Sequence, residues 1–535
     1  MNTQERKSRG SDYKPLLYTT TVRNPERYKD LMRILLKYDG QMLDEKTVER
    51  VEKDLFRIGL YRPMKQSESI MEKWAGAEKG EVAFFALTDE ETDYLYRNNP
   101  QNHKEAGFPK GWPSRFDTQY KLMKILGFVY YSPGEKIEFS EAGRLLAETV
   151  SIKVNDGVIT REAVKPQNER IVFLNAFARH QRGNPFIREL NHNIPLVLLL
   201  EVITKLNADP EYNGAGIAYH ELPLLLFWKD DNAETLYRRI KQLRADYGYN
   251  PSDEVIEEIC TQEILGGFKK FKLKSIVDEY PDDFVRKMRL TGLISLRGAG
   301  RFIDINHNEE ETIRYLLAHY REWYLPIFGE KEYFDYAGRL LPYFSGLMLA
   351  PAPKTRAGEF LPRLSELHEY APDMVKAELY GLSKGLASKH PTLRFIPAPA
   401  RLEFLTALAI SQNFDSVIVS PNYPCDDEGL PLSTAGGDKG DIECREGRRG
   451  ILVEVTMAGG RLQTMMEVWP IGRHLEAFSK DFEEGNAQGL FVAPSLYPDT
   501  LNQFAWLRDS KRQVIHPYKI ADFLDMIEKF TTLFR

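Results

Sequence analysis

The sequence predicts a multidomain α+β protein with an N-terminal region of winged-helix subdomains, a helical connector and a C-terminal α/β domain built on a mixed sheet. At 535 residues the chain is too long for a single hydrophobic core. A helix–strand–turn–strand pattern occurs twice in the N-terminal half, and helices alternate with strands after residue 400. The predicted boundaries are 1–300 for the N-terminal region, 301–390 for the connector and 391–535 for the last domain.

The first repeated pattern lies between residues 116 and 150. It predicts a helix, a strand at 127–131, a Ser-Pro-Gly-Glu turn, a return strand at 136–139 and a helix capped by Ser140. In the second pattern, Asp282 or Asp283 caps a basic helix, and a strand at 292–296, a glycine turn and a strand at 302–305 follow. This order is typical of winged helices, which commonly bind DNA.

Any DNA-binding surface must be a local patch, because the formal net charge is -6 and phosphate contacts need Lys and Arg. A helix at 232–247 carries four basic residues, and residues 268–274 alternate lysines with apolar residues. Such a helix is often only a solvated face, and winged helices also mediate protein contacts. The candidate DNA contacts are Arg115, Lys121, Lys124, Arg238, Arg239, Arg286 and Arg289.

The connector is helical and aromatic, and a Pro/Gly-rich stretch at 345–358 predicts a hinge within it. Elements then alternate through the last domain. The sequence predicts helices at 400–411, after Pro470, at 501–508 and from Ile520, and strands at 416–420, 441–445, 450–456, 489–493 and near Val514.

Two acidic residues in this last domain predict a metal site. Period-two alternation in the strand 451–456 places Glu454 on the same face as Leu452 and Thr456, and a carboxylate in so apolar a strand is costly to bury without a partner. Asp441 lies thirteen residues earlier, and a turn at 446–449 would pair its strand antiparallel to that of Glu454. Oxygen ligands from adjacent strands suit Mg²⁺. The alternative is a surface hairpin with ordinary acids.

Several protein classes are disfavoured. The three cysteines show no CxxC spacing, which argues against a disulfide framework and a zinc ribbon. The most apolar run, 194–203, is short and interrupted by Glu201, so we expect a cytoplasmic protein with no membrane segment. No Walker-type Gly-Lys-Ser/Thr motif is present, which disfavours an NTP-driven machine.

Four motifs stand in order in the last domain: Ala435-Gly-Gly-Asp-Lys-Gly-Asp-Ile442, Leu452-Val-Glu-Val-Thr456, Glu467-Val-Trp-Pro-Ile-Gly-Arg-His474 and Leu490-Phe-Val-Ala-Pro494. In these motifs the chain resembles the AlwI-type family of type IIS restriction and nicking endonucleases, within the PD-(D/E)xK nuclease superfamily. Weaker similarity reaches back to residues 127–129, 140–146, 194–197 and 291–293.

The resemblance implies a nuclease that hydrolyses DNA outside an asymmetric site with Mg²⁺-activated water. It implies that Asp441 and Glu454 bind the metal, with the carbonyl of Val455 as a further ligand. Glu403 falls at the position of an accessory acid, and Glu467 and His474 at positions that line the site. Double-stranded DNA is the expected partner. Cutting both strands would need a second nuclease domain from a transient homodimer or another subunit, and relatives that lack one only nick.

Two departures from the superfamily pattern bear on the mechanism. Gly440 stands where proline is usual, and Thr456 replaces the common lysine. Lys439 and His474 are the two hypotheses for the group that orients the attacking water, although His474 is also compatible with a purely structural role. Two alternative functions are a winged-helix regulator without catalysis and a nuclease that cuts without a fixed sequence.

Overall fold

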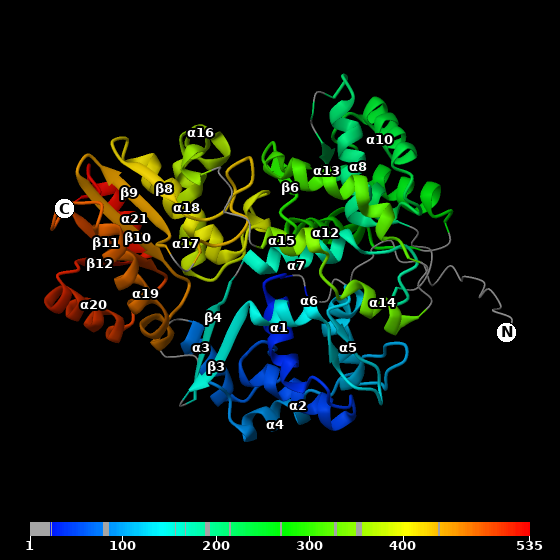
Figure 1. Cartoon of the computed structure of the whole chain (residues 1–535), viewed down its shortest axis with the longest axis horizontal. Helices are drawn as coiled ribbons and strands as arrows, with labels where there is room; N and C mark the ends of the chain where they lie inside the picture. Colours follow the sequence, from blue (N-terminus) through cyan, green and yellow to red (C-terminus); the bar gives the residue numbers. More distant parts are fainter. Residues whose placement is uncertain are drawn as a thin grey trace. The chain divides into compact units, whose positions relative to one another are not determined.

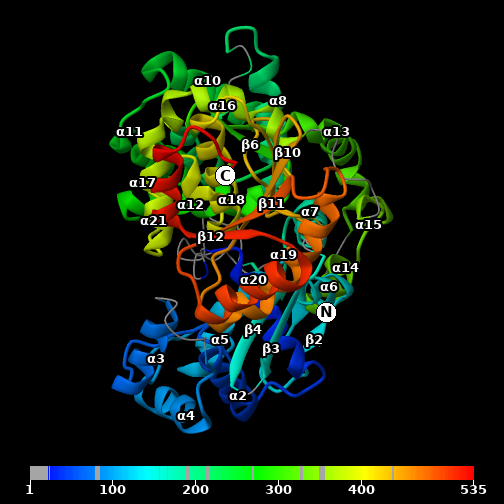
Figure 2. The ribbon, with the colours of Figure 1, turned by 90° about the vertical axis from the view of Figure 1, so that its left-hand side faces the viewer.

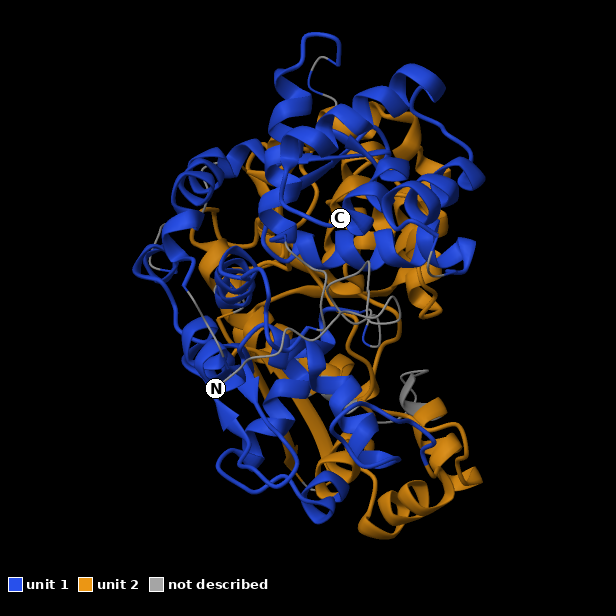
Figure 3. Ribbon diagram, turned by 90° about the vertical axis from the view of Figure 1, so that its right-hand side faces the viewer, with its two compact units in different colours: residues 1–49, 101–148, 167–350 blue, residues 50–100, 149–166, 351–535 orange. Residues whose placement is uncertain are grey.

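The structure is a computed structural model (Figure 1), and its described residues fall into two compact units (Figure 3). The first unit comprises residues 1–49, 101–148 and 167–350, and the second comprises residues 50–100, 149–166 and 351–535. This division reflects packing alone, and the boundaries at residues 300 and 390 remain a prediction. The described residues are 22, 24–78, 85–155, 157–165, 167–187, 193–212, 214, 216–267, 270–325, 329–348, 356–436 and 439–534.

Residues 349–355 of the predicted hinge lie outside the described residues. Where it is described, the first unit consists mostly of helices, with two small sheets among them. Its elements are α1 (Arg27–Leu35), η2 (Leu36–Tyr38), α5 (Trp112–Ile125), β1 (Val129–Tyr130), β2 (Glu138–Phe139), α6 (Glu141–Glu148), α7 (Gln167–Ala178), α8 (Pro195–Ala208), β5 (Ile217–Ala218), η3 (Tyr219–Glu221), α9 (Leu222–Phe227), α10 (Ala233–Tyr247), α11 (Asp253–Glu258), η4 (Ile259–Ile264), η5 (Ser275–Glu279), α12 (Tyr280–Arg289), β6 (Ile294–Arg297), β7 (Phe302–Ile305), η6 (His307–Glu309), α13 (Glu310–His319), η7 (Tyr320–Trp323), α14 (Glu330–Ala337) and α15 (Pro342–Leu347).

Both repeated patterns form the predicted elements. β1 and β2 pair antiparallel, and the Ser140 hydroxyl accepts a hydrogen bond from the Gly143 N–H at 3.1 Å, as the predicted cap requires. β6 and β7 also pair antiparallel, and β5 completes a three-stranded sheet in the order β5-β7-β6.

The predicted cap of α12 is wrong. α12 continues from the π-helical segment η5 and begins at Tyr280, so Asp282 and Asp283 lie within the helix. There they pair with Arg286 and Lys287, one turn further along the same helix.

The second unit contains a five-stranded mixed sheet in the order β12-β11-β10-β9-β8 (Figure 2). β10 runs parallel to β11 and antiparallel to β9, which confirms the predicted mixed sheet. Its elements, besides α2 (Glu45–Arg57) at the unit boundary, are α3 (Glu68–Glu78), α4 (Asp89–Asn98), β3 (Val150–Asn155), β4 (Val158–Ala163), η8 (Ala357–Glu359), α16 (Leu361–Glu366), η9 (His368–Tyr370), α17 (Pro372–Ser383), η10 (Leu393–Phe395), α18 (Ala398–Asn413), β8 (Ile418–Pro421), β9 (Ile442–Glu446), β10 (Arg449–Val455), α19 (Arg461–Ser479), β11 (Ala487–Ala493), α20 (Pro498–Lys511), β12 (Ile515–Lys519) and α21 (Ile520–Lys529).

Two groups of helices pack with this sheet. α18 contacts β8, α16, α17 and α21, whereas α19 contacts β10, β11 and α20. Beneath α19, Leu452 and Phe491 of the sheet form a core with Val468, Ile471 and Leu475 of the helix. No described helix is long and apolar enough to cross a membrane.

α19 is longer than predicted, because it begins at Arg461 and carries Pro470 inside it rather than at its start. A proline has no N–H to donate and usually marks a helix boundary. Apolar side chains on both sides of Pro470, Val468 and Ile471, are buried against the sheet, and this packing offsets the lost hydrogen bond. As a result Glu467 and His474 lie seven residues apart on one helix, and therefore on one face of it.

Candidate active site

Asp441 and Glu454 meet at the point where β9 and β10 run side by side. The turn after Glu446 pairs the strands antiparallel, with Ile442 opposite Val453, so Asp441 comes level with Glu454. The Val455 N–H donates to Asp441 Oδ2 at 2.8 Å. The pairing predicted from the sequence is therefore the one that the structure has.

Asn422, which was not among the predicted site residues, fixes the backbone that leads to Asp441. Asn422 follows β8, and its backbone N–H donates to the Asp441 carbonyl at 2.8 Å. Its side-chain Nδ2 donates to the Gly440 carbonyl at 2.7 Å. The only sequence signal was an Asn placed directly after a strand, a position from which its amide can replace a neighbouring strand's hydrogen bonds.

The close packing at Gly440 explains why glycine stands at this position. A Cβ on residue 440 would lie 2.5 Å from Leu452 Cδ1 and 2.9 Å from Glu454 Oε1. Those separations are shorter than van der Waals contact, so proline, or any residue with a side chain, would push against the carboxylate that the site needs.

α19 brings its two polar residues to β10. His474 Nδ1 is 2.9 Å from Glu454 Oε1. Two residues after Glu454, just past the end of β10, the Thr456 hydroxyl donates to Glu467 Oε1 at 2.6 Å. Thr456, at the position usual for lysine, is thus buried and bound to an acid, and it gives the site no positive charge.

Glu403 reaches the same cluster from α18. It is only 4% exposed and lies among apolar neighbours on its helix. Its Oε2 accepts a hydrogen bond from the Ala435 N–H at 2.9 Å, at the start of the loop that leads to Asp441. Gly437 and Asp438 of that loop lie outside the described residues.

These acids hold one another's pKa values above the ordinary carboxyl range. Burial, followed by the charge of Glu454, raises the pKa of Asp441 well above its usual value. Burial and Glu467 do the same for the pKa of Glu454, and burial and Asp441 for the pKa of Glu403. Burial also raises the pKa of Glu467. So many neighbouring carboxyl groups retain protons unless a cation offsets their charge.

Comparison with protein families decides which class of protein holds this cluster. The profile described as "AlwI restriction endonuclease" matches residues 124–334 and 389–526, which include most of the first repeated pattern, all of the second, Asp441 and Glu454. The chain belongs to the AlwI restriction endonuclease family. Members of this family are type II restriction endonucleases, which are DNA hydrolases, so the resemblance seen in the sequence is confirmed.

Solved structures show more distant similarity. The small subunit of the heterodimeric restriction endonuclease R.BspD6I is 20% identical, with 29% of this chain and 77% of that chain covered and a TM-score of 0.25. The restriction endonuclease FokI is 13% identical over 96% of this chain and 97% of its own, with a TM-score of 0.26. FokI bound to DNA is 12% identical over 94% and 95%, with a TM-score of 0.22. No curated protein sequence matches the chain.

Restriction endonucleases typically need a divalent metal ion, and the donor set of this AlwI-family site fits one. Among the described residues, no three His, Cys, Asp or Glu side chains are already grouped as metal ligands. Two carboxylates and a backbone carbonyl nevertheless suit Mg²⁺, which keeps several waters. The raised pKa values of Asp441 and Glu454 indicate a place where positive charge is lacking.

The other candidate for water orientation, Lys439, lies apart from these contacts. Its side chain is exposed, two residues before Asp441, and its backbone N–H donates to the Gly436 carbonyl. The structure therefore brings Asp441, Glu454, Glu403, Glu467, His474 and Thr456 into one cluster and leaves the Lys439 ammonium in solvent.

Most of the candidate DNA contacts have other partners in the first unit. Lys124 is only 9% exposed, lies over the rings of Tyr130, Tyr131 and Phe186, and pairs with Glu330. Arg289 is also buried, and Arg115 is half-buried. The remaining ion pairs are Lys121 with Glu105 and Asp117, Arg238 with Glu234, Arg239 with Glu263, and Arg286 with Asp282.

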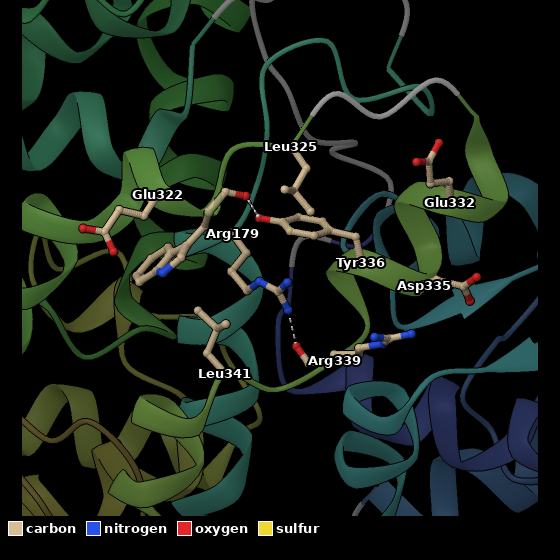
Figure 4. Close-up of a pocket in the computed structure, with 9 residues that line it drawn as sticks. Arg179, Glu322, Leu325, Glu332, Asp335, Tyr336, Arg339 and Leu341 are labelled. Carbon is tan, nitrogen blue, oxygen red and sulfur yellow. Dashed lines mark hydrogen bonds between the residues drawn. The ribbon is translucent and has the colours of Figure 1, made fainter.

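A pocket of about 390 Å³ opens elsewhere in the first unit (Figure 4). Arg179 crosses it, donating to the Arg339 carbonyl, with its guanidinium 4.1 Å from the centre of the Tyr336 ring. The lining also includes Glu322, Glu332 and Asp335. Its lining thus carries three acids and two arginines, and none of the candidate site residues lines it.

Proposed function

We propose that this restriction endonuclease is a Mg²⁺-dependent type IIS enzyme that hydrolyses DNA a short distance outside an asymmetric recognition site. A strand-specific nicking enzyme is the alternative. The observation that carries the proposal is the pairing of Asp441 with Glu454 at the junction of β9 and β10, where burial raises both pKa values, together with the charge of Glu454 for Asp441 and that of Glu467 for Glu454.

In this proposal Asp441, Glu454 and the Val455 carbonyl hold the ion. An ion bound there would supply Lewis acidity and offset charge on the phosphate under attack. The Val455 N–H orients the Asp441 carboxylate, and His474 orients that of Glu454. Glu403 adds an accessory acid, and Thr456 holds Glu467 beside the cluster.

The attacking water needs a group that orients it, because Thr456 supplies no ammonium. His474 lies at the acid cluster, with Nδ1 2.9 Å from Glu454 Oε1, and imidazole is a common proton-transfer group. Lys439 is exposed close to Asp441 in the chain. We therefore propose that either His474 or Lys439 orients the attacking water. His474 also positions Glu454.

The topology of the first unit supports a winged-helix module for DNA recognition. α8, β5, α9 and α10 follow one another, and β6 and β7 then form a hairpin that pairs with β5. One helix, one strand, two helices and a two-stranded wing make up a winged helix, here with residues 248–293 inserted before the wing. We propose residues 1–300 for recognition, 301–390 for the connector and 391–535 for the nuclease, with β7 completing the wing just past the first boundary.

One cluster of this kind cuts one strand. Cleavage of both strands would require a second nuclease domain, from a transient homodimer or from another subunit. Membership in a restriction endonuclease family favours this enzyme over a winged-helix regulator without catalysis.

Digestion of a plasmid of known sequence tests the proposal. The wild-type protein with Mg²⁺ should give discrete ends at a constant distance from one asymmetric sequence, and Asp441→Asn should give none while still binding the plasmid. Sequencing the ends of both strands separates double-strand cleavage from nicking. Random ends, or equal cleavage by Asp441→Asn, would contradict it.

A further inference from the structure

A short basic segment follows the π-helical turn of η4. Lys270, Lys272 and Lys274, here called the lysine row, are exposed, while Phe271 and Leu273 between them are half-buried. The Phe271 ring packs edge-on against Phe227 at the end of α9, with 5.3 Å between ring centres. The apolar side chains thus anchor the segment, and the ammonium groups extend into solvent.

The lysine row differs from the basic residues of neighbouring helices in having no acidic partner. Among the described residues, no carboxylate lies within 4.0 Å of any of its three ammonium groups. By contrast Arg238, Arg239 and Arg286 each pair with a carboxylate. A paired cation must give up its partner before it can bind a phosphate, whereas an unpaired one retains its full charge for the ligand.

The lysine row borders the helices of the proposed recognition module. Phe227 joins it to α9, and the ion pair between Arg239 Nε and Glu263 Oε1, at 2.6 Å, joins α10 to η4 just before it. α10, drawn in green in Figure 1, has an exposed polar face, whereas nearly every residue of α12 is buried or half-buried. The exposed face of α10 includes Thr235, Arg238 and Gln242, whose side chains suit base edges.

The charges along the chain also favour an anionic ligand. The whole protein has a formal net charge of -6, and the segments on either side of the row, 253–263 and 278–283, are rich in Asp and Glu. Residues 270–274 contain three lysines and no acid. A short basic segment between acidic segments attracts a polyanion locally, without making the whole protein surface positively charged.

We propose that Lys270, Lys272 and Lys274 bind the phosphate backbone of the DNA duplex whose groove α10 enters. This inference rests on the proposed function. The row supplies affinity that does not depend on sequence, and α10 supplies the contacts that do. Binding releases a counterion for each phosphate neutralised, so the row makes DNA binding depend steeply on salt.

The test measures DNA binding without cleavage, in EDTA, by fluorescence anisotropy of a labelled mixed-sequence duplex across a salt series. Lys270→Ala/Lys272→Ala/Lys274→Ala should reduce the slope of log K against log salt by up to about 2.7, since each phosphate contact contributes about 0.9. Affinity at moderate salt should fall about tenfold or more. The exposed positions should leave the thermal unfolding temperature unchanged.

Two controls separate charge at this place from charge in general. The Lys→Arg triple variant at the same positions should keep the wild-type slope. A second alanine triple at Lys384, Lys389 and Lys480, which are exposed, scattered and outside the proposed recognition region, changes the net charge equally and should also keep the wild-type slope.

An unchanged slope in the row variant, or an equal loss in the scattered variant, would overturn the inference while leaving the nuclease proposal standing. If the wild-type protein neither bound nor cut DNA, the proposed function itself would fail, and the inference with it.

Discussion

The backbone of one strand fixes the carboxylate of its neighbour: the Val455 N–H of β10 donates to Asp441 Oδ2 at 2.8 Å. Through this hydrogen bond Val455, the last residue of β10, holds the Asp441 carboxylate in place. Glu454, one residue earlier on β10, is held by His474 of α19, whose Nδ1 lies 2.9 Å from Glu454 Oε1. One carboxylate is thereby oriented by a backbone amide and the other by an imidazole nitrogen.

Replacing His474 should misplace Glu454 without unfolding the domain. We expect His474→Ala to lower the cleavage rate about a hundredfold, the usual effect of misplacing a catalytic group by about 1 Å. Steady-state cleavage of a mapped site measures it. Glu476→Ala, exposed on the same helix, should cleave at the wild-type rate. A wild-type rate for His474→Ala would leave His474 a structural residue only.

Lys439 is tested separately, because its ammonium is exposed and not buried in the cluster. If it orients the attacking water, Lys439→Ala should lose about 10²-fold in rate or more, and Lys439→Arg should recover part of that loss. Single-turnover rates at several pH values check this. Full activity of Lys439→Ala would remove Lys439 from the mechanism.

A side chain at residue 440 should disturb both stability and catalysis. The Cβ of Gly440→Ala would press on Leu452 and on Glu454 Oε1, so we expect a loss of about 1–3 kcal/mol in the free energy of unfolding and slower cleavage. Gly381→Ala is the matched control, since a Cβ there meets nothing within 4 Å and the residue lies in α17. It should be neutral or stabilising by up to about 1 kcal/mol. Denaturant titration measures both.

The raised pKa values predict how stability varies with pH when no divalent ion is present. A folded carboxyl group with a raised pKa contributes stability below its unfolded pKa, and that contribution is lost as pH rises through the folded pKa. For Asp441 and Glu454 the ordinary values are 3.8 and 4.5, so the loss begins above that range. Metal-free protein should therefore melt at progressively lower temperature towards pH 8.

Two additions to this melting series identify the cause. Mg²⁺ should restore the melting temperature most at high pH, because the ion replaces the missing protons. Asp441→Asn, which removes one of the repelling charges, should depend less on pH and respond little to Mg²⁺. Equal pH profiles for the wild type and Asp441→Asn would show that the cluster does not titrate as described.

A buried ion pair in the first unit should matter far more than an exposed one on the same helix. Arg244 donates to Glu221 with its side chain 2% exposed and that of Glu221 fully buried. Arg244→Met leaves Glu221 uncompensated and should cost about 3–5 kcal/mol. Arg238→Met breaks an exposed pair and should cost no more than about 1 kcal/mol. Thermal and urea unfolding measure the stability of the two variants. Equal losses of stability would contradict the assignment of the Arg244–Glu221 pair as buried and the Arg238–Glu234 pair as exposed.

The sequence alone determined many of the local elements and the pairing of the strands that carry the two principal acids. Period-two alternation and a tight turn identified the β9–β10 hairpin, and the same reasoning placed Asp441 beside Glu454. Capping chemistry located the helix after Ser140. These features depend on backbone preferences and on spacing along the chain, which neighbouring residues specify.

Only the tertiary structure decided which polar groups are buried and what they bind. It placed Lys124 among aromatic rings, gave Arg244 a buried acid, continued α19 through Pro470 and set Asn422 against the Gly440 carbonyl. Each of these outcomes depends on an element distant in sequence that packs against the residue. Periodicity shows which face of a helix or strand is apolar, but it does not show which neighbour will cover that face.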